Sequence, residues 1–182
     1  LANGSHTLVA KAYDAANNIG TSSNVAFSIN NTVSKQLILN GGFESGSTSW
    51  TATSGVITND SSQASRAGTY KAWLNGYGAA HVDSLYQQIT IPSTSTSTTL
   101  NFWLKVVSDE TTTTQAYDTL KLQIRNSSGT VLSTLATYSN LNKGTSYISK
   151  SFDLSAYKGQ TIRIYFLGTE GSVTATSFLI DD

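Results

Sequence analysis

Short runs in which apolar and polar residues alternate are the feature that most limits what this chain can fold into. In residues 100–106, Leu100, Phe102, Leu104 and Val106 alternate with polar or aromatic neighbours. Successive side chains of a β-strand point to opposite faces, so this pattern predicts a strand that buries its apolar face. No segment shows a helical apolar period of useful length, and we therefore expect an all-β protein.

Similar runs, separated by turn residues, recur along most of the chain. They predict strands near residue 56 and over residues 70–75, 84–91, 99–107, 118–126, 131–138, 147–154, 161–167 and 176–182. The same alternation predicts that a second group of apolar residues faces the core: Leu120, Leu122, Ile124, Ile162, Ile164 and Phe166. Many short strands with turns between them indicate a β-sandwich.

The first 31 residues have a pattern of their own. Residues 6–13 alternate, a turn-rich segment follows, and Val25, Phe27 and Ile29 alternate again. This predicts a β-hairpin, which is rarely stable alone in water. The stretch GSHTLVAKAYDAANNIGTSSNVAFSIN resembles the last strands of bacterial immunoglobulin-like domains, which read Gly-Ser-His-Thr, Ala-x-Asp and Asn-x-Gly. We assign residues 1–31 to such strands, 32–36 to a linker and 37–182 to a second domain.

The composition narrows the range of partners and of cellular settings. Eleven basic and eleven acidic residues give a formal net charge of zero, and nothing indicates a nucleic-acid or anionic-membrane partner. No apolar run is long enough to span a bilayer. The absence of cysteine excludes disulfides and thiolate metal sites. Polarity supplied by Ser, Thr, Asn and Gly is typical of β proteins outside the cell, so we expect a secreted or cell-surface location.

The segment 37–50, LILNGGFESGSTSW, is the densest motif. It places Glu44 directly after Phe43 and a few residues before Trp50. A carboxylate among so few charges is either a solvated turn residue or a ligand, and the motif alone leaves both open.

Several segments together carry a family resemblance. They are LILNGGFESGSTSW, GTYKAWL, LYQQITIP, FWLK, FDLSAYKGQTIRIYF and the closing FLIDD. They resemble the jelly-roll carbohydrate-binding modules related to families 4, 9 and 22, and the jelly-roll domains appended to secreted bacterial peptidases and glycosidases. The resemblance covers residues 37–182 and implies a β-sandwich jelly roll, preceded here by the immunoglobulin-like hairpin fragment.

The resemblance also implies a structural calcium ion where the first and last strands meet. The implied ligands are the carboxylates of Glu44 and of Asp181 or Asp182, the carbonyl of Gly42, and carbonyls near Tyr70 or Lys71. Calcium takes about six to eight hard oxygen ligands and accepts backbone carbonyls. The alternative is that Glu44 only caps a turn.

The period of two also points polar and aromatic side chains outward. The candidate ligand-binding residues are Trp103, Lys105, Gln123, Arg125, Arg163 and Tyr165. On one shared sheet they would form a face on which sugar C–H groups stack on rings and hydroxyls meet planar polar groups. Alternatively, a neighbouring domain or a long loop covers Trp103.

Other polar residues support weaker hypotheses. His81, Asp83 and Ser84 are the residue types of a hydrolytic triad, but residues this close on an extended segment point to alternating sides. A second calcium site is one interpretation of the loop carboxylates, and the alternatives are a hydrogen-bonded loop set or solvated side chains. The carboxylates are Asp83, Asp109, Glu110 and Asp118.

We therefore expect a non-catalytic accessory module of a secreted bacterial enzyme, stabilised by calcium and linked covalently to neighbouring domains of a longer chain. It would bind polysaccharide or another extracellular polymer. The alternative is a structural spacer or adhesion module of a bacterial surface protein. A hydrolase is disfavoured because no paired-carboxylate or nucleophile motif stands out.

Overall fold

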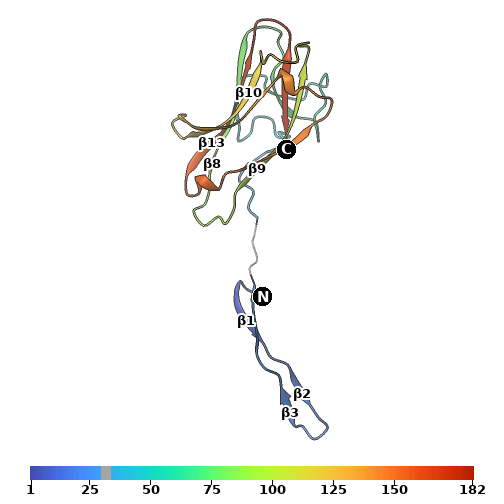
Figure 1. The fold of residues 1–182 in the computed structure, drawn as a ribbon, viewed down its shortest axis with the longest axis vertical. Coiled ribbons are helices and arrows are strands. Elements are labelled where there is room, and N and C mark those ends of the chain that lie inside the picture. Colours follow the sequence, from blue (N-terminus) through green and yellow to red (C-terminus); the bar gives the residue numbers. More distant parts are fainter. Residues whose placement is uncertain (30–33) are drawn as a thin grey trace. The chain divides into compact units, whose positions relative to one another are not determined.

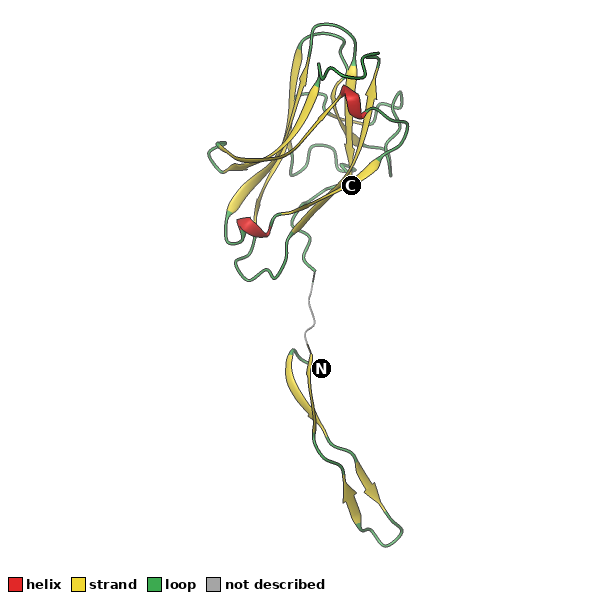
Figure 2. Cartoon of the chain, in the orientation of Figure 1, coloured by secondary structure: helices red, strands yellow, loops and turns green. Residues whose placement is uncertain are grey.

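The computed structural model describes residues 1–29 and 34–182, and the chain divides into two compact units, Leu1–Gln36 and Leu37–Asp182. The predicted linker at 32–36 falls partly outside the described residues. Strands are the main regular secondary structure of both units, as Figure 2 shows. The only helices among the described residues are two short 3-10 turns, so none could cross a membrane.

The first unit consists of two antiparallel strand pairs. β1 (Gly4–Leu8) pairs with β4 (Val25–Ile29), and β2 (Lys11–Tyr13) pairs with β3 (Ile19–Thr21). The predicted hairpin therefore forms, while its assignment to an immunoglobulin-like domain stays a prediction.

The second unit is a two-sheet sandwich (Figure 1). Its strands are β5 (Thr51–Ala52), β6 (Ile57–Thr58), β7 (Lys71–Asn75), β8 (His81–Thr90), β9 (Thr99–Ser108), β10 (Thr119–Asn126), β11 (Val131–Ser139), β12 (Ile148–Asp153), β13 (Thr161–Glu170) and β14 (Thr176–Asp181). One sheet, the β13 sheet, has the order β11-β10-β13-β8-β5, and the other, the β9 sheet, has the order β12-β9-β14-β7-β6. The predicted all-β sandwich is confirmed.

The core lies between the two sheets and follows the predicted alternation. All the apolar residues predicted to face inward are buried: Leu100, Phe102, Leu104, Val106, Leu120, Leu122, Ile124, Ile162, Ile164 and Phe166. Phe102 of the β9 sheet meets Phe166 of the β13 sheet edge to face, with ring centroids 5.1 Å apart. Burial of these side chains supplies the main driving force for packing the sheets together.

The apolar segment that opens the second unit, residues 37–39, is not a strand. The side chain of Gln87, which is buried, pairs with the backbone of Leu39 instead of a neighbouring strand. The Leu39 N–H donates to Gln87 Oε1 at 2.8 Å, and Gln87 Nε2 donates to the Leu39 carbonyl at 2.9 Å. A side-chain amide thus satisfies this stretch of backbone.

Candidate functional site

The six predicted ligand-binding residues do not form one face. Trp103 and Lys105 are on β9, whereas Gln123 and Arg125 are on β10 and the other two are on β13. β9 belongs to one sheet, and β10 and β13 belong to the other. The condition that the strands share one sheet is therefore not met: alternation along a strand indicates whether a side chain points inward or outward, but not the sheet to which the strand belongs.

Trp103 is covered by a loop, as the alternative interpretation had it. The Arg66 guanidinium carbon lies 4.1 Å from the centroid of the Trp103 ring. Beside it, Lys105 Nζ donates to Gln63 Oε1 at 3.4 Å. The loop before β7 therefore occupies the part of this sheet on which a sugar would have stacked.

The other four predicted residues lie together on the outer side of the β13 sheet, next to two residues of β8. Strand register places Gln123 opposite Tyr165, and Tyr165 opposite Tyr86. The next row places Arg125 opposite Arg163, and Arg163 opposite Gln88. We call this surface the Tyr–Arg face, and its members are Tyr86, Gln88, Gln123, Arg125, Arg163 and Tyr165.

Rings and guanidinium groups stack on the Tyr–Arg face. The rings of Tyr86 and Tyr165 are almost parallel, at 10°, with centroids 5.3 Å apart. The Arg125 guanidinium carbon lies 3.5 Å from the Tyr165 centroid, and that of Arg163 lies 5.0 Å from the Tyr86 centroid. Such cation–π contacts stabilise the positions of both arginines.

Amide groups fix the arginines further. Nε and Nη2 of Arg125 donate to Gln123 Oε1 at 3.0 and 2.6 Å. Nε of Arg163 donates to Gln88 Oε1 at 3.3 Å, and its Nη2 donates to the Ser127 carbonyl at 2.5 Å. All these partners are neutral, so the two positive charges are oriented without being neutralised.

The sequence interpretation missed Tyr86 and Gln88. Their outward direction can be read from the alternation in LYQQITIP. Their neighbourhood with Tyr165 and Arg163 depends on the pairing of β8 with β13, which are about 80 residues apart along the chain.

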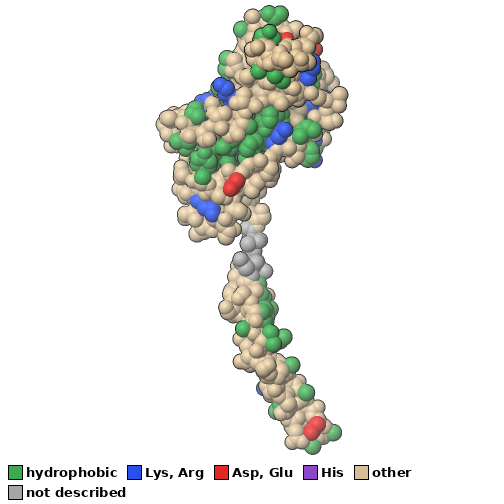
Figure 3. Space-filling model, viewed as in Figure 1, with side chains coloured by type: hydrophobic (Ala, Val, Ile, Leu, Met, Phe, Trp, Pro, Cys, Tyr) green, Lys and Arg blue, Asp and Glu red, His purple; other side chains and the backbone are tan. Residues whose placement is uncertain are grey.

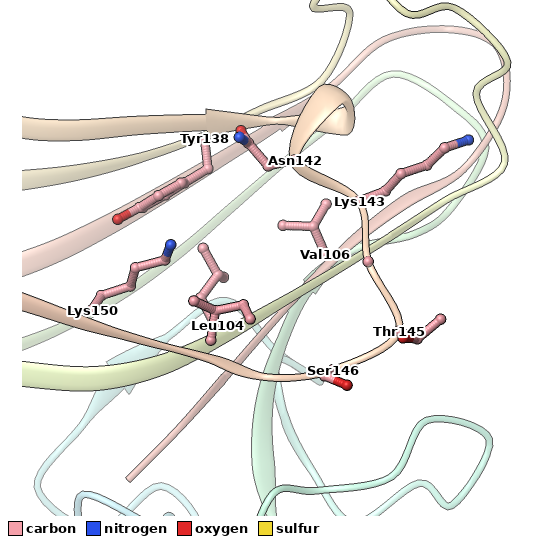
Figure 4. A pocket seen from close by; sticks show the side chains of 10 residues that line it. Leu104, Val106, Tyr138, Asn142, Lys143, Thr145, Ser146 and Lys150 are labelled. Carbon is pink, nitrogen blue, oxygen red and sulfur yellow. The ribbon is translucent and has the colours of Figure 1, made fainter.

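A second candidate is a pocket of about 300 Å³ where the edge strands β11 and β12 leave the sandwich open (Figure 4). Leu104, Val106 and Ile148 supply apolar lining. Tyr138 and Lys150 lie beside one another, with Lys150 Nζ 5.1 Å from the ring centroid. Burial raises the pKa of the Tyr138 hydroxyl. A band of hydrophobic side chains is also visible on the sandwich unit in Figure 3.

Glu44 holds the loop that leads into β7. Its Oε1 accepts hydrogen bonds from the N–H groups of Thr69 and Tyr70 at 2.9 and 2.8 Å, and its Oε2 accepts from Thr69 Oγ1 at 2.9 Å. The bond from Tyr70 is the main cause that lowers the pKa of Glu44. Gly68 has φ +59°, and a Cβ there would lie 2.3 Å from Glu44 Oε1, so glycine leaves room for the carboxylate.

Asp181 and Asp182 hold the same loop from the end of β14. Asp181 is fully buried, and its Oδ2 accepts from the N–H groups of Arg66 and Ala67 at 2.7 and 3.1 Å. Burial raises the pKa of Asp181, and the nearby charge of Asp182 raises it further. Both carboxylates approach Gly42, where a Cβ would lie 3.2 Å from Asp182 Oδ1 and 4.0 Å from Asp181 Oδ1.

The residues predicted to bind calcium therefore form two separate groups. Glu44 contacts Tyr70, and Asp181 and Asp182 lie beside Gly42. Asp181 and Asp182 beside Gly42 offer the hard carboxylate oxygens that calcium takes, and Asp181 is buried, while Arg66 Nη1 already pairs with Asp182 Oδ2. Lys71 is buried, its Nζ donates to the Asp60 carbonyl at 2.6 Å, and burial lowers its pKa. Across residues 1–29 and 34–182, no three acidic or histidine side chains converge on one metal position.

The residues considered for a second calcium site are engaged separately. Asp83 Oδ2 accepts from the Asn75 N–H at 2.8 Å, and its Oδ1 lies 3.2 Å from His81 Nε2. Asp118 accepts from the Gly171 N–H and the Thr176 hydroxyl. Glu110 accepts from the Thr174 hydroxyl, whereas Asp109 is exposed. These contacts agree with the hydrogen-bonded loop interpretation.

Comparisons with known proteins place the fold. No protein-family model and no curated protein matches the sequence. A family 61 carbohydrate-binding module, TmCBM61, solved with β-1,4-galactotriose, has a TM-score of 0.58 at 15% identity and covers 81% of this chain and 96% of its own. A structure of carbohydrate-binding modules of the β-sandwich superfamily has a TM-score of 0.50 at 11% identity, covering 99% of this chain and 73% of its own.

A third similar structure is the enzymatically active domain of tailspike protein 4 of bacteriophage CBA120. Its TM-score is 0.50 at 14% identity, and the match covers 78% of this chain but 20% of the tailspike domain. The second unit thus has the β-sandwich fold of carbohydrate-binding modules, and the predicted fold is confirmed.

Proposed function

We propose that this chain is a non-catalytic accessory module of a secreted enzyme and that it binds carbohydrate on the Tyr–Arg face. The observation that carries the proposal is the ladder of stacked tyrosines, arginines and glutamines across β10, β13 and β8. It lies on a fold shared with TmCBM61, which was solved in complex with β-1,4-galactotriose.

The chemistry of this face suits a polyhydroxylated chain. Guanidinium and amide groups are planar donors and acceptors that can pair with adjacent hydroxyls of a sugar ring. Tyr86 and Tyr165 cover one ring face each by their mutual stacking, so they present edges and hydroxyls to a ligand. Binding would hold linked catalytic domains of the parent protein near their polymer and raise the effective concentration.

Affinity electrophoresis and calorimetry of the full chain against a panel of neutral and acidic polysaccharides test this proposal. We expect binding to at least one polymer and its loss in Tyr165→Ala. Tyr117→Ala is the matched control, since Tyr117 is an exposed tyrosine outside the Tyr–Arg face. Binding to no polymer, or equal loss in both variants, would contradict the proposal.

We further propose that a structural calcium ion binds Asp181 and Asp182 beside Gly42. The support is the buried Asp181 carboxylate next to Asp182: Arg66 pairs with Asp182, which leaves one negative charge of the two for a divalent cation to offset. Glu44 then serves to hold the Thr69–Tyr70 backbone, which lies in the same loop as the Asp181 partners.

Thermal melts with excess calcium and with chelator test the ion. Saturation to about 100 times the dissociation constant stabilises the folded state by about 2.7 kcal/mol, which raises Tm by several degrees. Asp182→Asn should weaken the response, and Asp153→Asn, at an exposed carboxylate on β12, should leave it unchanged. Identical melts in calcium and chelator would refute the calcium site.

A further inference from the structure

We propose that the Tyr–Arg face selects acidic polysaccharides, in which a uronate carboxylate pairs with Arg125 and Arg163. This inference rests on the proposed function, because it names the ligand class of the same face. Three observations support it. The surface carries more basic than acidic side chains, neither arginine forms a salt bridge within the described residues, and the tyrosine rings stack on each other and on the arginines.

The zero net charge of the chain hides an uneven surface. Residues 37–182 carry nine basic and ten acidic side chains. One of the basic residues and five of the acidic ones are buried, which leaves eight basic against five acidic side chains at the surface. The buried charged residues are Lys71, Asp83, Glu110, Asp118, Glu170 and Asp181. The fold therefore presents more positive than negative groups to solvent.

This imbalance is strongest on the β13 sheet. Its five strands contain two carboxylates, Asp83 and Glu170, and both are buried. The sheet also carries Lys121, Arg125 and Arg163, all of them at least partly exposed. Within the described residues, neither arginine forms a salt bridge. An anionic ligand would meet fixed positive charge here without having to displace a protein carboxylate.

The arginines are also prepared for a planar anion. Arg125 stacks on the Tyr165 ring, and its Nε and Nη2 donate hydrogen bonds to Gln123. Its Nη1 has no hydrogen-bond acceptor among the described residues, and Arg163 lies opposite it in the strand register. A guanidinium group matches a carboxylate in a planar, charge-assisted pair, and holding it in advance reduces the entropy lost on binding.

The tyrosines argue against nucleic acid as the anionic ligand. Proteins that bind single strands stack bases on open aromatic faces. Tyr86 and Tyr165 stack on each other, and Arg125 covers Tyr165 from 3.5 Å. A uronate polymer needs only hydroxyl and carboxylate partners, which this face supplies.

The test compares polygalacturonate with the same polymer after methyl esterification, which removes the charge and keeps the backbone. By calorimetry with the full chain, we expect the acidic form to bind roughly tenfold tighter or more, since charge-assisted pairs are about twice as strong as neutral hydrogen bonds. Added salt should weaken this binding. The double variant Arg125→Gln/Arg163→Gln should abolish the preference for the acidic form.

Two controls keep the test decisive. Lys11→Gln/Lys35→Gln removes the same two charges from the first unit and should keep the preference. Arg125→Lys/Arg163→Lys keeps the charge but loses the planar fork, so it should retain the salt dependence with weaker binding. Each variant's Tm is measured first, and the salt series on the unaltered chain tests the idea even where a variant fails to fold.

The outcomes separate the two proposals. Equal or tighter binding of the esterified polymer, or binding to neutral polymers of the wider panel alone, overturns the acidic selectivity and leaves carbohydrate binding intact. Failure to bind any polymer overturns both. Equal affinity for single-stranded DNA at the same salt concentration also overturns this inference, because it would indicate general attraction of polyanions.

Discussion

Replacing Glu170 by glutamine tests how far buried carboxylates stabilise the loops of the sandwich. Glu170 ends β13, is 3% exposed and accepts four backbone N–H groups. Oε2 accepts from Gly76 and Tyr77, each at 3.0 Å. Oε1 accepts from Gly78 at 2.9 Å and Thr176 at 3.2 Å. One side chain therefore ties the turn after β7 to the start of β14.

The magnitude follows from this count. Glutamine has nearly the same shape, but its amide nitrogen cannot accept a hydrogen bond, so in either orientation two N–H groups face an NH₂ group. Of the four N–H groups, that of Thr176 is buried and the other three are partly buried. Each buried donor left without an acceptor costs about 1–3 kcal/mol, and partial exposure places these groups at the low end, which gives a loss of about 2 kcal/mol for Glu170→Gln. At roughly 2–4 °C per kcal/mol for a chain of this length, Tm should fall by at least several degrees.

Urea unfolding followed by tryptophan fluorescence, together with calorimetric melts, measures this loss. Asp153→Asn is the control, since it removes a carboxylate that is exposed and accepts from Ser155 alone. We expect the control to change stability by less than about 0.5 kcal/mol. If Glu170→Gln were as mild as the control, the buried carboxylate would not be stabilising these loops, and the reasoning would be wrong.

Two further predictions concern the loop before β7. Gly68→Ala should destabilise the folded state by about 1–2 kcal/mol from its left-handed backbone alone. Its Cβ also displaces Glu44, so adding Glu44→Ala to this variant should cost little more in the same urea assay; a further large loss would show that the two residues act independently. Trp103→Ala should leave polysaccharide affinity unchanged in calorimetry, because Arg66 covers the ring. A large loss of affinity would indicate that the polysaccharide binds on the β9 sheet instead.

The sequence predicted the direction of side chains better than their neighbours. Alternation within a strand is local, so the buried faces of β9, β10 and β13 followed directly from it. Which strands pair is decided by contacts between distant segments, and this separated Trp103 from Tyr165 and brought Tyr86 beside Tyr165. The local pattern also could not indicate that the buried Gln87 side chain takes the backbone hydrogen bonds of Leu39, because these residues are far apart along the chain.

Net charge is the property for which the sequence was least informative. A sandwich closes its ends with loops whose N–H groups need acceptors, and in this chain carboxylates such as Asp118, Glu170 and Asp181 meet that need from inside. Each carboxylate used in this way is buried and no longer contributes negative charge to the surface. Long basic side chains mostly remain at the surface, because burying their charge is costly. A chain with equal numbers of each sign therefore folds into a domain with a basic surface. The balanced composition argues against clustered phosphate binding, yet it is compatible with a face that pairs a few arginines with a uronate chain.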